Sequence, residues 1–547
     1  MSDDARQRVV LLGPTQQENL ALGYLASSAR ARGHAVELVT YSYRSDLDAA
    51  LRRTLALDPH LVGLGIAFQN NIDDYLVFVR ALRHRGYRGH VTAGGHVPTF
   101  CHEELLAELP ELDSVVRHDG EETLCEMLEQ LSRGEPPRNI AGLVWREGDQ
   151  VVVGRVRPAV SNLDSLPPPS RKSEPYSVGG LGVDFVITAR GCVGECHYCS
   201  IAAYTEAQLK RYRLRQPEAV ADEIARQYHE RGSRVIFVQD DLFVLPNEAR
   251  AVERIERLAQ ALSTRGVAEA AFWAKGRPET ITPEVCRALS DLGVIHLFLG
   301  VENASAERLA YLGRTHTPLD NESALARCRD AGIVPSFNFM LFDPDTELEQ
   351  VSATLALAER HLDLPWNVCR TEVYSGTALL ERLRGEGRIE GDWRSFGYRM
   401  RDARAEVMFR ILRVVLHEHA LAIESLLNRL ISLSFSRQLH QRFFPGEETD
   451  RLARAVNELG VEARGDTLAV LRETLAFVAH ANLGNDAEVR RFAASRALGL
   501  GARDRERRRR AEELWQHLEL RGRSLMQKRG VVLPRTAESG FRVAMGS

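Results

Sequence analysis

Neither sign of charge dominates this sequence. It carries 71 basic and 75 acidic residues, a net charge of −4, so no broad basic field is available and we do not expect a dedicated nucleic-acid binder. Lysine is scarce, with four of the 71 basic residues, and we interpret the arginine excess as codon usage in a GC-rich genome rather than as phosphate clamps. No apolar run reaches the ~18–20 residues of a membrane span, so we expect no membrane partner.

A secretory leader is also missing from the pattern of the first residues, which have no charged segment followed by an apolar core and cleavage site. We therefore expect a cytoplasmic protein. Eight cysteines are present, and three fall within eight positions. In a reducing compartment this clustering indicates metal binding or redox chemistry rather than a disulfide framework. The length of 547 residues corresponds to about three domains.

Residues 1–135 alternate between strand and helix patterns. Strand-like runs occur at 8–13, 35–39, 61–68, 90–93 and 114–117, with helical patterns at 18–32, 46–57, 72–85 and 121–131 between or after them. Five strands separated by helices predict an α/β domain with a parallel, doubly wound sheet of the flavodoxin or Rossmann type. Ligands of such sheets bind at the carboxyl ends of the strands.

Residues 136–182 form a connector with a hairpin pattern at 142–154 and a proline-rich spacer at 161–171. Residues 183–390 then repeat strand and helix six times, which predicts a partial (βα)6 barrel with its chemistry at the strand carboxyl ends. Residues 391–547 are mainly helical. One segment of this region, 405–435, places six apolar residues near one stripe: Met408, Ile411, Leu412, Val415, Leu416 and Leu426.

The strongest motif is a set of cysteines directly after the first barrel strand. Cys192, Cys196 and Cys199 are spaced C-x3-C-x2-C, and each thiolate can hold one iron of a [4Fe–4S] cluster, which leaves the fourth iron for another ligand. A zinc site is the alternative, but it needs a fourth Cys or His at a usual spacing, and His197 between the cysteines is poorly placed. Incidental cysteines are the third reading.

These cysteines, with Tyr198 before the third, resemble the signature of the radical S-adenosylmethionine (SAM) superfamily. The resemblance continues over about 200 residues, strand by strand. It implies that SAM binds the open iron and is cleaved to a 5′-deoxyadenosyl radical. It also implies a SAM site that contains Tyr198 and residues from three later strands. These are Gln239, Asp240 and Asp241 in VQDD at the second strand, Lys275 at the end of the third, and Gly300, Glu302 and Asn303 in LFLGVENAS at the fourth. A capped helix start is the alternative for VQDD, and solvated charge is the alternative for Lys275 and Arg277.

The first 135 residues resemble the cobalamin-binding domain that is fused to many radical SAM enzymes. The resemblance rests on ENLALGYLASSARARGHAVELVT, DPHLVGLGIAFQNN, VTAGGHVPTF and VVRHDGEETL in this order. It implies a cobalamin site at the strand ends: Gly13, Pro14, Thr15, Phe68, Gln69, Gly94, Gly95, His96 and Thr99. Gly94 and Gly95 would let the backbone approach the corrin or its nucleotide tail, and Thr99 would donate a hydrogen bond. A flavodoxin-like domain that binds nothing, or serves as an interface, is the alternative.

One motif match is interpreted as coincidental. Residues 58–63 fit D-x-H-x-x-G, whose His ligates cobalt in some corrinoid proteins, but there the motif follows the first strand. Here it precedes the third strand, and the loop at 13–23 has no His. We therefore expect base-off cobalamin without a protein His ligand, and His60 as a bystander.

The two resemblances together imply a cobalamin-dependent radical SAM methyltransferase that acts on an unactivated carbon of a small molecule or peptide, in natural-product biosynthesis. An external one-electron reductant of flavodoxin or ferredoxin type would reduce the cluster. The open alternatives are a cobalamin-dependent radical rearrangement or cyclisation, a polar methyl transfer, and a non-catalytic corrinoid- or cluster-binding sensor. The sequence identifies neither the substrate nor a catalytic residue beyond the cofactor sites. We expect residues 391–547 to shape the substrate pocket, with dimerisation or a folding appendage as the alternative.

Overall fold

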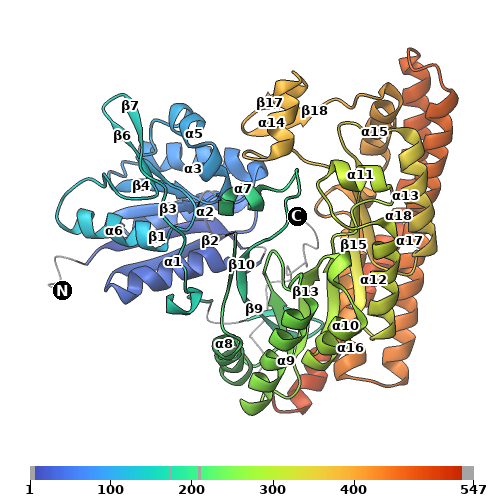
Figure 1. Cartoon of the computed structure of the whole chain (residues 1–547), viewed down its shortest axis with the longest axis horizontal. Coiled ribbons are helices and arrows are strands. Elements are labelled where there is room, and N and C mark those ends of the chain that lie inside the picture. The colour runs from blue at the N-terminus through green and yellow to red at the C-terminus, as the bar shows by residue number, and fades with distance from the viewer. Residues whose placement is uncertain (1–5, 16, 173–174, 207, 209–210, 532–547) are drawn as a thin grey trace. The chain divides into compact units, whose positions relative to one another are not determined.

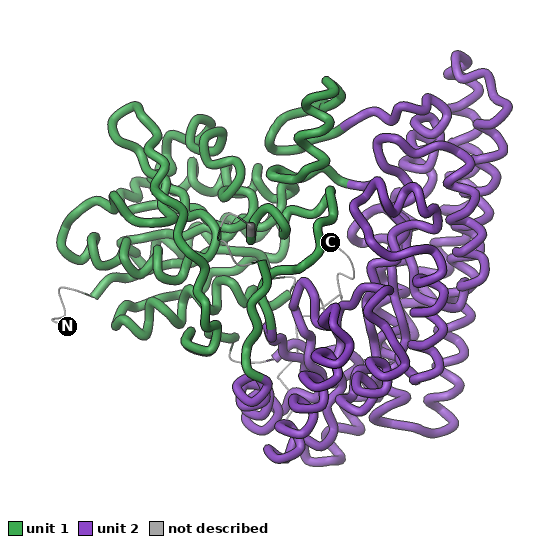
Figure 2. The backbone as a smooth tube through the Cα atoms, viewed as in Figure 1, with its two compact units in different colours: residues 1–173, 189–216, 372–397 green, residues 174–188, 217–371, 398–547 purple. Residues whose placement is uncertain are grey.

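The computed structural model describes residues 6–15, 17–172, 175–206, 208 and 211–531. The chain forms two compact units, and each is built from more than one stretch of sequence (Figure 2). Unit 1 contains residues 1–173, 189–216 and 372–397, and unit 2 contains residues 174–188, 217–371 and 398–547.

Unit 1 contains the expected doubly wound sheet (Figure 1). The strand order is β2-β1-β3-β4-β5-β6-β7, with β1 to β5 parallel and the hairpin β6–β7 added antiparallel. The strands are β1 (Arg8–Pro14), β2 (Ala35–Tyr41), β3 (Leu61–Gly65), β4 (His90–Gly94), β5 (Ser114–Val116), β6 (Leu143–Glu147) and β7 (Gln150–Val153). The helices are α1 (Leu20–Ala31), α2 (Leu47–Ala56), α3 (Ile72–His84), α4 (His96–Phe100), α5 (His102–Glu108) and α6 (Glu121–Ser132).

The apolar run of β1 explains why helices cover both faces of this sheet. Val9 and Leu11 point into one core with residues of α1 and α6. Val10 and Leu12 point into the other core with residues of α2 and α3. A strand buried on both faces is typical of a parallel sheet, and the sequence-based prediction of this fold is confirmed.

Unit 1 also holds three segments that the sequence assigned elsewhere. The cysteine segment, with β10 (Ala189–Gly191), α7 (Ser200–Glu206) and β11 (Tyr212–Leu214), belongs here rather than with a barrel at 183–390. The segment with α14 (Ala378–Gly385), β17 (Ile389–Asp392) and β18 (Ser395–Tyr398) also belongs to unit 1, except for Tyr398 at its end. The proline-rich connector is not a loose spacer, because the Ser170 N–H donates to the Gly23 carbonyl (3.0 Å) on α1.

Unit 2 contains the six parallel strands expected for the partial barrel. The order is β16-β15-β14-β13-β12-β9-β8, and only β8 runs antiparallel to its neighbour. The strands are β8 (Tyr176–Val178), β9 (Leu181–Val186), β12 (Ser233–Val238), β13 (Ala271–Gly276), β14 (Val294–Leu299), β15 (Val334–Phe342) and β16 (Trp366–Arg370). The connecting helices are α8 (Pro217–Glu230), α9 (Glu248–Thr264), α10 (Pro283–Leu292), α11 (Ala306–Tyr311), α12 (Pro318–Asp330) and α13 (Leu348–Arg360).

Helices from the C-terminal region are part of unit 2. They are α15 (Ala403–Val415), α16 (Leu426–Phe443), α17 (Glu447–His480) and α18 (Asp486–Lys528), with a π-helical turn at His417–Leu421. The apolar stripe expected along 405–435 is therefore divided between two helices. The division occurs because Ala422 is extended and the Ser425 side chain caps α16 by accepting from the Asn428 N–H.

Helix α16 covers one face of the barrel sheet. Right-handed crossovers between sequential strands place α8 to α13 together on one face, and α16 lies against the other. Phe435 packs edge-on against Phe237 of β12 and His296 of β14, at centroid distances of 5.3 and 5.5 Å. The His296 ring also bonds Gln438 of α16 (3.0 Å) and Ser336 of β15 (2.7 Å). The C-terminal helices thus complete the barrel core.

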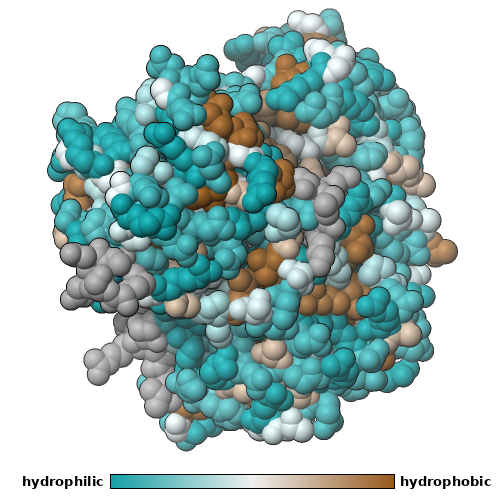
Figure 3. Space-filling view, turned by 60° about the vertical axis from the view of Figure 1, so that its left-hand side comes forward, coloured by the Kyte–Doolittle hydropathy of each residue, from teal (hydrophilic) through white to brown (hydrophobic). Residues whose placement is uncertain are grey.

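The face of the molecule in Figure 3 is mostly hydrophilic, with small separate apolar patches. Within the described part of the chain, every helix is too short or too polar to cross a membrane.

Candidate functional site

The three motif cysteines lie on one loop of unit 1, between β10 and α7. All three are half-buried. The loop starts with a turn that requires glycine, because Gly191 has φ +87° and a Cβ there would lie 2.0 Å from the Arg211 carbonyl oxygen. The Gly194 N–H donates to Cys192 Sγ (3.3 Å), and the Cys199 N–H donates to the Cys196 carbonyl (3.1 Å). Tyr198 is half-buried on the same loop.

The cysteine loop carries three thiols at the spacing from which a four-iron cluster was predicted, and in such a cluster each cysteine binds a different iron. Among the residues that the structure describes, no group of three His, Cys, Asp or Glu side chains is arranged to hold a single metal ion. A backbone N–H directed at a cysteine sulfur, as at Cys192, is the kind of contact that stabilises a cluster thiolate.

Buried ion pairs attach the strand pair β10–β11, which stands before and after the cysteine loop and α7 in the chain, to the segment after β5. Arg190 of β10 donates to Glu121 (2.6 Å) and lies 3.6 Å from Asp119. Arg213 of β11 donates to the other Asp119 oxygen (2.5 Å). Burial opposes the ionisation of Asp119, but the guanidinium groups of Arg190 and Arg213 outweigh it, and the pKa of Asp119 is lowered. Asp119 is therefore a buried carboxylate shared by both hairpin strands.

A cluster of rings attaches the helix after the cysteine loop to the same domain. Tyr204 of α7 stacks on His96 (4.5 Å between centroids) and meets the edge of His118 (5.1 Å). His118 Nδ1 donates to the Tyr204 carbonyl (2.9 Å), and His96 Nδ1 lies 3.2 Å from Ser200 Oγ. Burial, and then the neighbouring His118, lower the pKa of His96 to about 4, so its ring is neutral.

The predicted cobalamin residues lie at the carboxyl edge of the unit 1 sheet. Gly13 and Pro14 end β1 and Thr15 follows it. Phe68 and Gln69 follow β3, Gly94 ends β4, and Gly95, His96 and Thr99 follow β4. Parallel strands bring these positions to one edge. Phe68 is 43% exposed, whereas Gln69 Nε2 donates to the Trp393 carbonyl (2.9 Å).

The turn after β4 depends on Gly95. Its φ of +110° places the backbone so close to the end of β3 that a Cβ would lie 2.5 Å from the Ile66 carbonyl oxygen. Thr99, whose hydroxyl was expected to donate to cobalamin, makes two hydrogen bonds within the protein. Its Oγ1 donates to the Gly95 carbonyl (2.7 Å) and accepts from the His118 N–H (2.9 Å). Thr99 therefore supports the loop and links it to His118.

The predicted SAM residues other than Tyr198 belong to unit 2. On the face that α16 covers, five side chains toward the carboxyl ends of the strands are half-buried: Gln239, Lys275, Phe298, Asn338 and Cys369. Their neighbours along each strand are mostly buried. The Lys275 ammonium lies 6.0 Å from the ring centroid of Trp273. Asp241 is exposed. These positions line the open part of the face.

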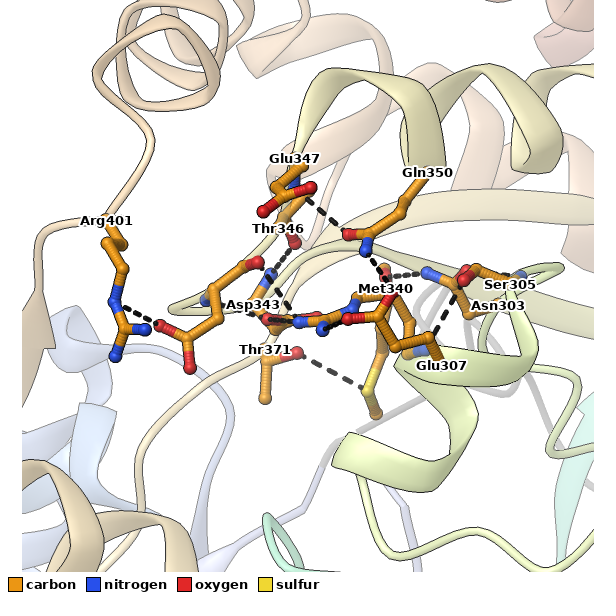
Figure 4. A network of polar contacts seen from close by, with 12 residues as sticks. Asn303, Ser305, Glu307, Met340, Asp343, Thr346, Glu347, Gln350, Thr371 and Arg401 are labelled. Carbon is orange, nitrogen blue, oxygen red and sulfur yellow. Dashed lines mark hydrogen bonds and ion pairs between the residues drawn. The ribbon is translucent and has the colours of Figure 1, made fainter.

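Other predicted SAM residues have structural contacts. Asp240 is 1% exposed and accepts from both the N–H and the hydroxyl of Thr188. Asn303 donates to the Met340 carbonyl (3.1 Å) and accepts from Ser305 (2.9 Å) (Figure 4). Both side chains hold their strand ends in place.

The neighbouring segment around Gly300 is held by an arginine. Arg314 donates to the Gly300 carbonyl (2.7 Å) and lies 3.7 Å from the Glu302 carboxylate. Glu302 has φ +60° and is 8% exposed. Arg277, unlike Lys275, pairs with Glu279 (2.7 Å).

The same close-up shows how the end of β15 is stabilised (Figure 4). Asp343 is fully buried, accepts from Arg308 (3.2 Å) and receives the N–H of Asp345 (2.9 Å). Burial raises the pKa of Asp343 in spite of the guanidinium beside it. Arg401 pairs with Asp345 (3.4 Å). This network fixes the loop that follows the strand.

Sequence reasoning did not single out four residues that hold the cysteine loop: His118, Asp119, Arg190 and Tyr204. His118 and Asp119 stand within VVRHDGEETL, but that motif was used only as a family pattern. A local signal exists at His118, whose φ of +60° is rare for a residue other than glycine. Backbone conformation is not visible in the sequence, however.

Comparison with known proteins identifies two domain types, and the match of the radical SAM type includes the cysteine segment of unit 1 as well as most of the barrel of unit 2. The model of the radical SAM superfamily matches residues 186–358, and that of the B12 binding domain matches residues 9–128. The chain is 30% identical over 389 residues to the "Uncharacterized methyltransferase PH0819" of Pyrococcus horikoshii, which is 70% of this chain and 81% of the relative. It is 26% identical over 277 residues to an anaerobic magnesium-protoporphyrin IX monomethyl ester cyclase of Cereibacter sphaeroides, 48% of this chain and 44% of the relative.

A solved structure shares the fold over most of the chain. The cobalamin-dependent S-adenosylmethionine radical enzyme OxsB with aqua-cobalamin bound superposes with a TM-score of 0.65 at 15% identity, over 99% of this chain and 83% of OxsB. The two domain types imply a [4Fe–4S] cluster, SAM and cobalamin as cofactors. The cysteine loop, the strand order of both sheets and these matches agree, and the chain belongs to the family of radical SAM enzymes that carry a B12-binding domain.

Proposed function

We propose that this enzyme is a methyltransferase that methylates an unactivated carbon of a small molecule or peptide, in natural-product biosynthesis. The observation that carries the proposal is that the cysteine loop and the strand edge predicted to bind cobalamin belong to one compact unit, in contact through Tyr204 and His96. When bound, the cluster and SAM supply a hydrogen-abstracting radical, and cobalamin supplies the methyl group. The methyltransferase name of the Pyrococcus relative supports the proposal.

The protein's own residues would bind and orient the cofactors. Cys192, Cys196 and Cys199 would hold the cluster, with Tyr198 on the same loop. Gln239 and Asp241 would accept hydrogen bonds from the ammonium of SAM, and the Lys275 ammonium would bind its carboxylate. Gly300 would shape the site through its backbone. Glu302, Asn303 and Asp240 would do the same, because the contacts above involve their side chains.

Cobalamin would bind base-off at the carboxyl edge of unit 1, along Gly94 and Gly95. His60 stands just before β3, at the opposite edge, where its Nδ1 accepts from the Arg8 N–H (3.0 Å). His118 Nε2 is enclosed by protein. His96 is the one predicted site residue that could compete as a ligand. Electron paramagnetic resonance of the Co(II) form should show no nitrogen splitting in the wild type, His60→Ala or His96→Ala. Splitting that disappears in either variant would identify that histidine as a ligand.

A cyclisation or rearrangement is the second candidate, because a relative is named as a cyclase. Products of SAM distinguish the candidates. Equal amounts of 5′-deoxyadenosine and S-adenosylhomocysteine per turnover support radical methylation. Deoxyadenosine alone supports rearrangement or cyclisation, S-adenosylhomocysteine alone supports polar transfer, and neither product supports a sensor. The triple change of the motif cysteines to Ala should abolish the iron content and all SAM cleavage.

Radical SAM enzymes need a reductant, and we propose a flavodoxin or ferredoxin in the cytoplasm as the partner. No nucleic-acid or membrane partner is proposed. Helix α16 packs against one face of the barrel sheet through Phe435 and Gln438. We therefore propose that the C-terminal helices shape the substrate pocket, rather than act as a dimerisation appendage.

A further inference from the structure

We propose that residues 118–121 of the cobalamin domain position the cysteine loop, so that binding of cobalamin and retention of the cluster stabilise each other. This inference rests on the cofactor sites of the proposed function but not on its reaction. His118, Asp119 and Glu121 are positioning residues: they contact the segments on both sides of the loop and not the cofactors themselves.

The ionic contacts fix the strand pair that brackets the loop, β10 before Cys192 and β11 after α7. Asp119 and Glu121 receive the guanidinium groups of Arg190 and Arg213, which face each other across the β10–β11 hairpin. Asp119 is 8% exposed and Glu121 is 3% exposed. Removing one partner of such a buried pair leaves the other charge uncompensated, so the hairpin has a strong preference for this position.

The ring contacts fix the side of the loop after Cys199. His118 holds the Tyr204 carbonyl through Nδ1, and its ring lies against the Tyr204 ring. A left-handed backbone at a histidine costs roughly 1 kcal/mol and persists only where the surroundings enforce it. Here the His118 N–H is bound to Thr99 Oγ1, which in turn donates to Gly95.

The chain of contacts therefore runs from Gly95 through Thr99 and His118 to α7. A ligand that orders the turn at Gly95 also orders His118, and through it the helix that follows the cysteines. By thermodynamic reciprocity, a bound cluster must then strengthen the binding of cobalamin by the same factor.

The experiment uses the full chain with its cluster reconstituted, and aquacobalamin as the probe. One measurement is the rate of iron loss to a chelator, with and without aquacobalamin. The other is the affinity for aquacobalamin, with and without the cluster. The wild type should lose iron at least about fivefold more slowly with aquacobalamin bound, and the presence of the cluster should tighten aquacobalamin binding. Neither readout requires turnover, so failure of the methyltransferase proposal is seen separately.

Asp119→Asn is the main variant, and Asp113→Asn is its matched control. The two carboxylates stand at opposite ends of β5, and Asp113 pairs with Arg83 (2.6 Å) away from the cysteine loop. Asp119→Asn should lose iron about tenfold faster or more, with an altered resonance spectrum of the reduced cluster, and should lose the effect of cobalamin. Asp113→Asn should keep the wild-type spectrum and the linkage, and Asp119→Glu should restore both.

His118→Gly tests the ring contacts without backbone strain, because glycine adopts φ +60° freely, and circular dichroism verifies that the variant is folded. It should weaken the linkage, and His118→Asn should recover part of it, since Asn tolerates this backbone and carries a donor. The proposal is overturned if both Asp119→Asn and His118→Gly keep the wild-type linkage and spectrum. It is also overturned if Asp113→Asn loses them to the same extent, since the effect would then be general destabilisation.

Discussion

Replacing Gly95 by alanine should strongly weaken cobalamin binding while the protein stays folded. Gly95 has φ +110° and ψ −168°, a region that is essentially restricted to glycine. The added Cβ would lie 2.5 Å from the oxygen and 2.9 Å from the carbon of the Ile66 carbonyl. These are backbone atoms at the end of β3, so they cannot turn away as a flexible side chain would.

The magnitude follows from these contacts. Holding alanine in this backbone region costs about 1–3 kcal/mol. Moving the turn away from Ile66 also breaks the hydrogen bond from the Val97 N–H to the Ile66 carbonyl (3.3 Å), which is worth about 1 kcal/mol. A turn destabilised by about 2–4 kcal/mol is rarely in its binding conformation, so the affinity for cobalamin should fall by about 30-fold or more.

Gly134→Ala is the matched control. Gly134 also has a positive φ, +72°, but nothing lies within 4 Å of the position of its Cβ. This change should cost about 1–2 kcal/mol of stability and leave cobalamin binding intact. Titration with aquacobalamin followed by absorbance measures the affinity, and circular dichroism verifies the fold. Wild-type affinity in folded Gly95→Ala, or an equal loss in Gly134→Ala, would refute the argument.

Three further predictions follow from unit 2. Phe435→Ala should lower the free energy of unfolding of this unit by about 3–5 kcal/mol in urea unfolding, because it opens a cavity against the barrel sheet. Leu498→Ala, on the exposed side of α18, is the control and should change it by less than about 0.5 kcal/mol. Burial lowers the pKa of His296 to about 4. As the pH falls from about 6.5 toward 4, His296 binds a proton in the unfolded chain but not in the folded chain, so the free energy of unfolding decreases. His296→Gln should reduce this dependence by up to about 1.4 kcal/mol per pH unit, measured as unfolding at pH 7 and 5.5. An unchanged dependence would contradict the prediction. Lys275→Met should weaken SAM binding about tenfold in equilibrium dialysis, and Arg277→Met, which removes the Glu279 pair, should weaken it less.

The sequence alone determined the parallel strands of both sheets, though not the edge strand β8, and its resemblance to two domain types implies the cofactors. Each barrel strand is a short apolar run between helical patterns, and such patterns depend only on neighbouring residues. The same holds for the spacing of Cys192, Cys196 and Cys199 on one loop, from which a cluster site is predicted. Five parallel strands in unit 1 and six in unit 2 were therefore predicted correctly.

The tertiary structure decided which parts of the chain hold these elements. Asp119 and Arg213 are 94 positions apart, and His118 and Tyr204 are 86 apart. A sequence with 71 basic and 75 acidic residues offers many equivalent pairings, so no local pattern assigns the cysteine loop to the cobalamin domain. Likewise, α16 shows no sequence preference for a sheet face until Phe435, Phe237 and His296 are brought together. Local periodicity encodes the elements, whereas long-range burial and charge pairing select one arrangement of them, and only the folded chain contains that information.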